Sequence, residues 1–237
     1  MEVLVLLVAL ACYGLAAWSL QREGTPIYLF LAFAGQLGML ATPLWNWLYR
    51  DPYAADLAVF AELFGIPLYS LQAFGAAWHY TLPVMITYYL YTRRWWFPNY
   101  FTALLAYVVF MFYHALLEVV GLNAGLWNYT NSPTMPPGIS PAFLAVLMGA
   151  LISLILLYVV MTVRRYSWQS LFVFIVPAPL LLAILVRGVI GAPYWIVQAI
   201  DVEPWTQLIG SLSTVVLTFV GVHIFADALG KAEVELA

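Results

Sequence analysis

Residues 99–122 read NYFTALLAYVVFMFYHALLEVVGL, an apolar run that carries one histidine and one glutamate near its end. About 20 apolar residues are enough to cross the hydrocarbon core of a bilayer as an α-helix. The bilayer core offers no water to the backbone, and this run is too long for a strand of a membrane barrel. It therefore predicts a transmembrane α-helix with two ionisable groups inside it.

The rest of the chain repeats this pattern. Of its 237 residues, 65% are hydrophobic and 8% are charged, against roughly 25% charged in soluble domains. We therefore expect a single all-α domain, 1–237, a polytopic integral membrane protein with a bundle of seven transmembrane helices. Turn residues and charges place the predicted spans at about 2–20, 26–49, 71–92, 99–122, 141–163, 169–190 and 205–229.

One segment, 52–70, fits none of these spans. We interpret it as an interfacial or re-entrant segment, or as the start of an eighth span.

Cytoplasmic loops carry an excess of Lys and Arg, and this rule tests the threading. With the N-terminus outside, only Arg50 and Arg187 of the eight basic residues lie outside. The inside residues are then Arg22, Arg93, Arg94, Arg164, Arg165 and Lys231.

This count favours seven spans, with the N-terminus outside and the C-terminus in the cytoplasm. An eighth span would place four of these arginines opposite Arg22. The short inside loops and the absence of a basic secretory leader favour a bacterial inner membrane, and in any case a multi-pass protein of the cell membrane.

Ionisable side chains inside spans are rare and are functional candidates by default. His114 and Glu118 are four residues apart and share one face of their helix. At about 1.5 Å per residue, His114 and His79 each lie about 12 Å below the outer ends of their helices. Arg187 is close in depth to Glu118, which predicts an ion pair between them. The predicted catalytic residues are Glu118, His114 and His79.

Further polar and aromatic residues are predicted near the outer mouth of this site. They come from the second and third spans and from the loops at the outer face. We assign them, with Arg187, to substrate binding: Asn46, Trp47, Glu62, Trp78, Trp127 and Asn128.

Three alternatives remain open for these groups. Glu118 and Arg187 would neutralise each other at a helix interface without any chemistry. His79, His114 and Glu118 have the ligand types of a mononuclear metal site, although we predict no metal and no cofactor. His223 and Asp227 repeat the four-residue spacing, but at the inner end, where solvated charges are common.

A carboxylic acid in an aromatic, low-dielectric cavity suits acid–base or carbocation chemistry. The function predicted is therefore that of a membrane enzyme acting on a lipid or isoprenoid near the outer leaflet, as a cyclase, isomerase or hydratase. Integral membrane terpene cyclases are similar in length and span number, but the second span, GQLGMLATPLWNWLY at 35–49, lacks their acidic motif.

The other function class is a non-catalytic transport, ligand-binding or assembly subunit, with membrane-complex partners or a second copy of the chain. A retinal pigment needs a lysine within the last span, and the only lysine, Lys231, lies beyond it. No basic patch suggests nucleic acid. The bilayer and a lipid or isoprenoid substrate are the expected partners.

Overall fold

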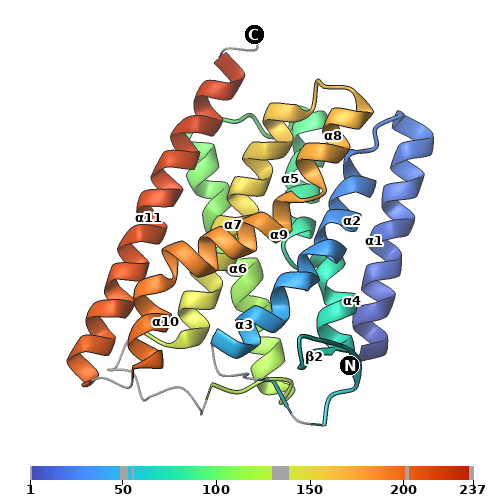
Figure 1. Ribbon diagram of the computed structural model, residues 1–237. Coiled ribbons are helices and arrows are strands. Elements are labelled where there is room, and N and C mark those ends of the chain that lie inside the picture. Colours follow the sequence, from blue (N-terminus) through green and yellow to red (C-terminus); the bar gives the residue numbers. More distant parts are fainter. Residues whose placement is uncertain (1, 49–52, 55, 130–138, 201–202, 235–237) are drawn as a thin grey trace.

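The computed structural model describes residues 2–48, 53–54, 56–129, 139–200 and 203–234, which form a bundle of helices (Figure 1). Six helical segments in these ranges are long and apolar enough to cross a membrane. They are α1 (Glu2–Glu23), the run from α2 (Ile27–Gly38) through η1 (Met39–Ala41) to α3 (Thr42–Leu48), α6 (Tyr100–Asn123), α7 (Pro141–Val163), the run of α8 (Trp168–Ile175), α9 (Ala178–Ala183) and the π-helix η2 (Ile184–Ile190), and α11 (Pro204–Val234). The all-α membrane class is confirmed at this level.

The predicted span at 71–92 is interrupted. It consists of α4 (Ser70–His79) and α5 (Thr81–Thr92), which meet at Tyr80. Pro83 has no N–H for the carbonyl of His79, and its ring crowds the preceding turn. The Thr81 hydroxyl donates to the Ala77 carbonyl at 2.6 Å across the break. Each half is too short to count as a span by itself.

Two neighbouring spans are interrupted as well. The α2–α3 run passes through the short 3₁₀ helix η1 just before Pro43, and the α8–η2 run is broken at Pro177 and ends in a π-helix. The α2 helix packs against both α4 and α9, so the interrupted elements lie together. Irregular backbone at membrane depth is tolerated where it is buried in protein or lines a cavity. The three breaks thus point to one region of the bundle.

The segment 52–70 contains a β-hairpin in its described part, a strand pair that we did not predict from the sequence. Strands β1 (Val59–Leu63) and β2 (Ile66–Tyr69) pair antiparallel. They are joined by Phe64 and Gly65, with φ of 55° and 76°. Positive φ at both central residues gives a two-residue turn whose twist matches that of the strands.

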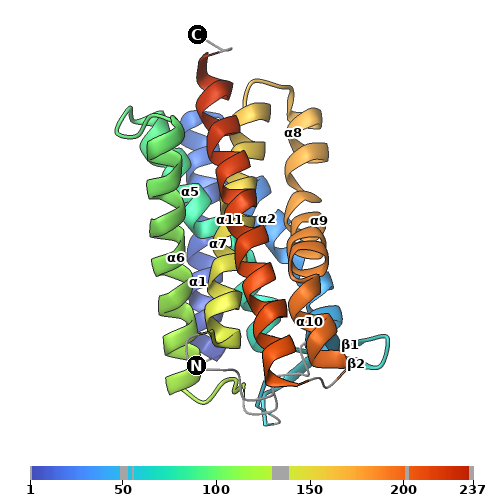
Figure 2. The ribbon, with the colours of Figure 1, turned by 90° about the vertical axis from the view of Figure 1, so that its left-hand side faces the viewer.

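The centre of the bundle is α7, the most buried of the candidate spans. It packs against α5, α6, α9 and α11 and lies in the middle of the helices in Figures 1 and 2. The outer helices expose apolar side chains such as Phe101, Leu105 and Phe112. A largely apolar interior with an apolar exterior is the pattern of a membrane bundle.

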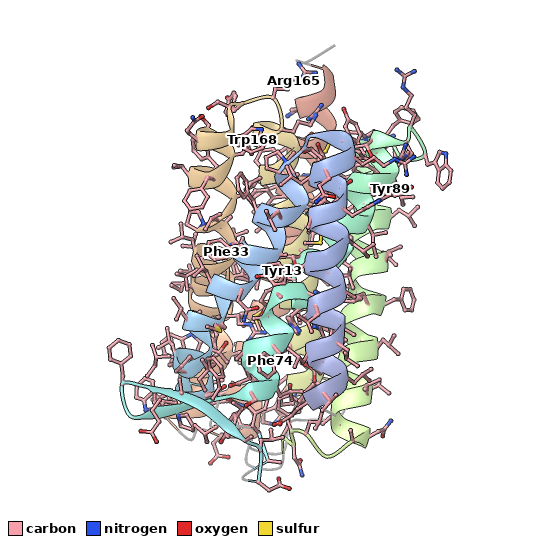
Figure 3. All side chains as sticks on the ribbon, turned by 90° about the vertical axis from the view of Figure 1, so that its right-hand side faces the viewer. Tyr13, Phe33, Phe74, Tyr89, Arg165 and Trp168 are labelled. Atoms are coloured by element: carbon pink, nitrogen blue, oxygen red, sulfur yellow. The ribbon has the colours of Figure 1, made fainter. Side chains whose placement is uncertain are left out.

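The two ends of the bundle differ in charge. At the end opposite the hairpin, where Figure 3 labels Arg165, Trp168 and Tyr89, Arg93 pairs with Glu23 at 2.9 Å. The C-terminal part of α11 projects from this end (Figure 1). The short α10 helix (Ala192–Ala199) lies at the opposite end. The N-terminus and the hairpin lie together at the other end.

Candidate active site

A cavity of about 290 Å³ lies at the end of the bundle that carries the hairpin. Its walls come from α1, α2, α3, α4, α6 and α7, with residues of the loops and of the π-helix. This volume is near the lower end of the range for small-molecule sites, roughly 300–1,000 Å³. Six of the residues predicted for the site line it, together with further aromatic side chains. These six are Asn46, Trp78, His79, Glu118, Trp127 and Arg187.

Glu118 is held by two aromatic donors. It lies one turn before the end of α6, where the chain turns back at Gly125 (φ 67°). Trp127 Nε1 donates to Glu118 Oε2 at 2.9 Å, and the Tyr129 hydroxyl donates to the same oxygen at 3.1 Å. Hydrogen bonds to a carboxylate are charge-assisted and short. The carboxylate therefore has a fixed orientation in the cavity wall.

Tyr129 can act as a donor over the whole physiological range. Burial and the nearby Glu118 carboxylate both raise the pKa of its phenol. Tyr53, which faces Trp127 with ring centroids 5.8 Å apart, has its pKa raised to about 12 by burial. Both phenols thus keep their protons, and Tyr129 keeps its hydrogen bond to Glu118.

Gly121 makes room for this arrangement. A β-carbon built on Gly121 would overlap the six-membered ring of Trp127. The indole therefore lies directly on the α6 backbone, one turn beyond Glu118. The loop is fixed further by a backbone bond from Ala54 N to Leu126 O at 3.0 Å and by the bridge between Tyr53 and Trp127.

His79 and His114 lie next to each other, but only His79 reaches the cavity. His79 lines the cavity, and its ring centroid is 5.1 Å from that of His114 in an edge-to-face arrangement. His114 is 3% exposed and does not line the cavity. The ring nitrogens of His79 make no hydrogen bond to any residue in the described part of the chain.

A hydrogen-bond chain connects His114 to the break between α4 and α5. Ser153 on α7 donates to the Tyr80 carbonyl at 3.0 Å and lies 3.2 Å from His114 Nε2. The single hydroxyl proton of Ser153 is used for the carbonyl, so Nε2 of His114 carries a proton and donates it to Ser153. His114 thus supports the interrupted backbone next to His79.

Arg187 comes from the π-helix, and its guanidinium lies over the ring of Tyr80 at 5.7 Å from the centroid. Among the ion pairs of the described residues, none joins Arg187 to Glu118, so the predicted direct pair is wrong. The carboxylate is bonded by Trp127 and Tyr129 instead. The guanidinium is near enough to act on Glu118 electrostatically.

A second polar chain lies in the opposite wall. Backbone Tyr69 N donates to Gln72 Oε1 at 3.0 Å, and Gln72 Nε2 donates to Asn46 Oδ1 at 3.1 Å. Because the backbone N–H fixes the Gln72 amide, it also fixes that of Asn46. Asn46 therefore presents its Nδ2 group away from Gln72, and this group has no acceptor in the described structure.

Three residues predicted for substrate binding are not in the cavity wall. Trp47 is 67% exposed on α3, Glu62 lies on β1, and Asn128 is exposed in the loop between Trp127 and Tyr129. The sequence placed all three near the outer mouth by depth alone. The α3 helix turns Asn46 inward and Trp47 outward, because adjacent helical residues point about 100° apart.

The structure adds site residues that the sequence reading did not select. They are Tyr53, Gln72, Gly121, Tyr129 and Ser153. Gln72 and Ser153 are polar residues in apolar runs, and this signal was available. Tyr53 and Tyr129 come from loops, where periodicity gives no information.

The described residues contain no group of three or more His, Cys, Asp or Glu that could hold a metal ion. His114 is turned to Ser153, and Glu118 to Trp127 and Tyr129. His79, His114 and Glu118 are thus not assembled as a ligand set. At the other end, His223 bonds to Tyr100 at 3.0 Å and Asp227 pairs with Lys231 at 2.6 Å, so these two do not form a site with each other.

Ser153→Ala tests the buried hydrogen-bond chain. It leaves the His114 N–H and the Tyr80 carbonyl without their partner, and a buried unsatisfied group costs about 1–3 kcal/mol. We expect a lower midpoint of thermal unfolding for the purified protein in detergent. The control is Thr218→Val, because the buried Thr218 hydroxyl bonds only to Thr214 O of its own helix. Equal shifts in both variants would contradict a specific role for Ser153.

Comparisons of the chain with protein-family models, with curated proteins and with solved structures gave no match.

Proposed function

We propose that this chain is a multi-pass enzyme of the cell membrane that acts on a lipid or isoprenoid by acid–base chemistry at Glu118. The observation that carries the proposal is a single carboxylate, oriented by two donors, in a cavity whose described lining is otherwise mostly apolar and aromatic. Low dielectric strengthens the interaction of such a group with a developing charge. Aromatic faces stabilise a cation within about 6 Å of the ring centre.

The reaction class follows from these groups. Protonated Glu118 gives its proton to a carbon–carbon double bond, whose π electrons form the new C–H bond and leave a cation on the neighbouring carbon. The carboxylate then takes back a proton, either from an adjacent carbon or from a water molecule that has added to the cation. The first outcome is isomerisation, or cyclisation if the π electrons of a second double bond of the substrate have first formed a carbon–carbon bond to the cation. The second outcome is hydration.

The other polar groups have supporting roles in this scheme. His79 faces the same cavity and is placed to accept or return a proton, while His114 and Ser153 position it from behind. Arg187 acts on the carboxylate through space. The aromatic lining residues Trp45, Trp78 and Tyr194 would stabilise the cation in this scheme.

The experiment compares lipid extracts by mass spectrometry from cells with and without the protein. The expected result is the loss of one lipid and the gain of another with the same mass, or with the mass of one added water. An unchanged lipid profile at normal protein levels would refute the enzymatic proposal.

A lipid transporter or lipid-binding subunit is the second candidate. It is favoured by the interrupted spans around the cavity, because discontinuous helices frame the substrate sites of many transporters. In that case the extracts would contain the same lipids, and the distribution of one lipid between the two leaflets would change instead.

We further propose that α4 and α5 together cross the membrane as a seventh span, with the N-terminus outside and the C-terminus in the cytoplasm. Support comes from the ends of α1, α5 and α7, which bring Arg22, Arg93, Arg94, Arg164 and Arg165 to the end where α11 terminates. The positive-inside rule assigns that end to the cytoplasm. The cavity then lies near the outer leaflet, in a bacterial inner membrane on our assignment.

The orientation predicts the behaviour of a reporter. A reporter enzyme fused after Ala237 is expected to be active only in a form that folds in the cytoplasm. The same reporter inserted after Gly125, in the loop next to the cavity, is expected to be active only in its exported form. The reverse pattern would overturn the orientation and place the cavity in the inner leaflet.

A further inference from the structure

The cavity reaches the outer surface of the bundle on one side. Two of its lining residues are exposed apolar side chains, Leu4 of α1 at 58% and Val120 of α6 at 45%. Leu4 lies near the start of α1 and Val120 near the end of α6. Both of these helix ends lie at the end of the bundle that carries the hairpin (Figure 2). On the proposed threading, these exposed apolar side chains face the outer leaflet.

The packing explains why this side is open. The α1 helix packs against α2 and α4, whereas α6 packs against α7 and α11. The short α4 helix ends at His79 and lies next to α1, so the cavity separates these two groups of helices. Gly75 on α4 has no side chain to fill the space, and a β-carbon there would meet only Val5 within 4 Å.

The end of the cavity, by contrast, is covered by paired loops. Tyr53 and Trp127 form a backbone bridge, and their rings contact each other. The Tyr53 ring also contacts Tyr69 of the hairpin, with centroids 5.7 Å apart. Among the described residues, the loops thus cover the end of the cavity, whereas the side entrance past Leu4 and Val120 is lined by apolar side chains.

Two of the described residues that line the cavity carry free hydrogen-bond donors. Asn46 Nδ2 and Trp78 Nε1 are buried N–H groups without an acceptor among the described residues. A buried donor without a partner is unfavourable by about 1–3 kcal/mol, so an acceptor atom brought by a ligand recovers this energy. Both donors are uncharged N–H groups. They thus fit a neutral, oxygen-bearing group of a ligand.

From these features we infer that a single-chain lipid with a neutral, oxygen-bearing end enters the cavity from the bilayer between α1 and α6. Its chain lies in the opening between Leu4 and Val120, and its oxygen accepts hydrogen bonds from Asn46 and Trp78. The inference rests on the proposed function only in that this lipid is the substrate or product on which Glu118 acts. Binding itself does not need the reaction.

The test uses the purified full-length protein in lipid nanodiscs and a C20 isoprenoid alcohol with a photoreactive diazirine on its chain. Crosslinks are mapped by mass spectrometry. We expect labelling of cavity residues such as Leu71, Leu117 and Ala145. Leu4→Trp and Val120→Trp should each reduce this labelling several-fold, because the indole fills the opening.

The matched controls are Leu10→Trp on α1 and Val108→Trp on α6. Their side chains are 58% and 43% exposed, close to those of Leu4 and Val120, but neither lines the cavity. They should leave the labelling unchanged. Unlabelled isoprenoid alcohol should compete better than the matched hydrocarbon or the matched phosphate ester, and Asn46→Leu should abolish that preference.

Two results would overturn the inference: equal labelling in the opening variants and their controls, or stronger competition by the hydrocarbon or the phosphate ester. The Glu118→Gln protein separates this inference from the proposed function. It should be labelled as strongly as the wild type. If labelling behaves as expected but no lipid is converted in cells, the opening stands and the enzymatic proposal fails.

Discussion

Glu118→Gln is expected to lower the rate of lipid conversion by about 10²- to 10⁴-fold, the usual contribution of a positioned general acid or base. The amide retains the size of the carboxyl group and still accepts a hydrogen bond from Trp127 or Tyr129. It cannot give a proton to a substrate or take one back. The rate is measured in membranes, by mass spectrometry of the lipid pair found in the extracts.

The control for this variant is Glu203→Gln, the same change at an exposed carboxylate near the start of α11, outside the cavity. It should convert lipid at the rate of the wild type. Glu118→Asp retains a carboxylic acid, but its side chain is one methylene shorter, so the acid lies farther from a substrate held in the cavity. Its rate of lipid conversion should lie between those of the wild type and Glu118→Gln. If Glu118→Gln retained the wild-type rate with normal protein levels, Glu118 would not be the acid or base.

The sequence was sufficient to select most of the polar wall. Ionisable groups are so rare in this chain that depth alone matched His79 to His114 and Arg187 to Glu118. Of these four residues, His79, Glu118 and Arg187 line the cavity. The hydrogen-bond partners of these side chains could not be predicted from depth. Residues four apart on a helix share a face but differ in height by about 6 Å. His114 therefore meets Ser153 while Glu118 meets the loop.

The contact of Arg187 differs from the predicted one for another reason. The prediction of its partner used depth and opposite charge alone, which do not fix the direction of a side chain around the helix axis, and residues Ile184–Ile190 form a π-helix. Each residue added to a turn rotates the following side chains around the axis, so a position read from the α-helical period is displaced. The guanidinium consequently lies over Tyr80 and not against the carboxylate.

The hairpin and the aromatic donors depend on long-range pairing. Strand β1 carries an irregularity between Val59 and Ala61, which disturbs the alternation that would have marked it as a strand. Phe64 occupies a turn position with positive φ, where Gly, Asn or Asp is the usual signal. Tyr53 reaches the site because its loop pairs with the loop after α6, and one sequence contains no record of that pairing.

Gly121→Ala is expected to lower the rate of lipid conversion by roughly 10- to 100-fold without changing a residue that contacts the substrate. The new methyl group would occupy the place of the Trp127 ring, so the indole must move off the helix. Its bond to Glu118 at 2.9 Å is then lost. A hydrogen bond to a charged group contributes about 1.5–3 kcal/mol, which corresponds to a rate change of this size. The same lipid assay measures it.

A double-mutant cycle shows whether the effect passes through Trp127. Trp127→Phe removes the N–H donor and also the ring atoms that the methyl group would meet, so it should reduce the rate to a similar degree. Adding Gly121→Ala to Trp127→Phe should then have little further effect, because both changes remove one interaction. Gly14→Ala on α1 is the backbone control, since a β-carbon there meets no atom within 4 Å. The Gly14→Ala protein should convert lipid at the wild-type rate. If the losses from Gly121→Ala and Trp127→Phe were additive, Gly121 would act through the α6 helix itself and not through the indole that orients Glu118.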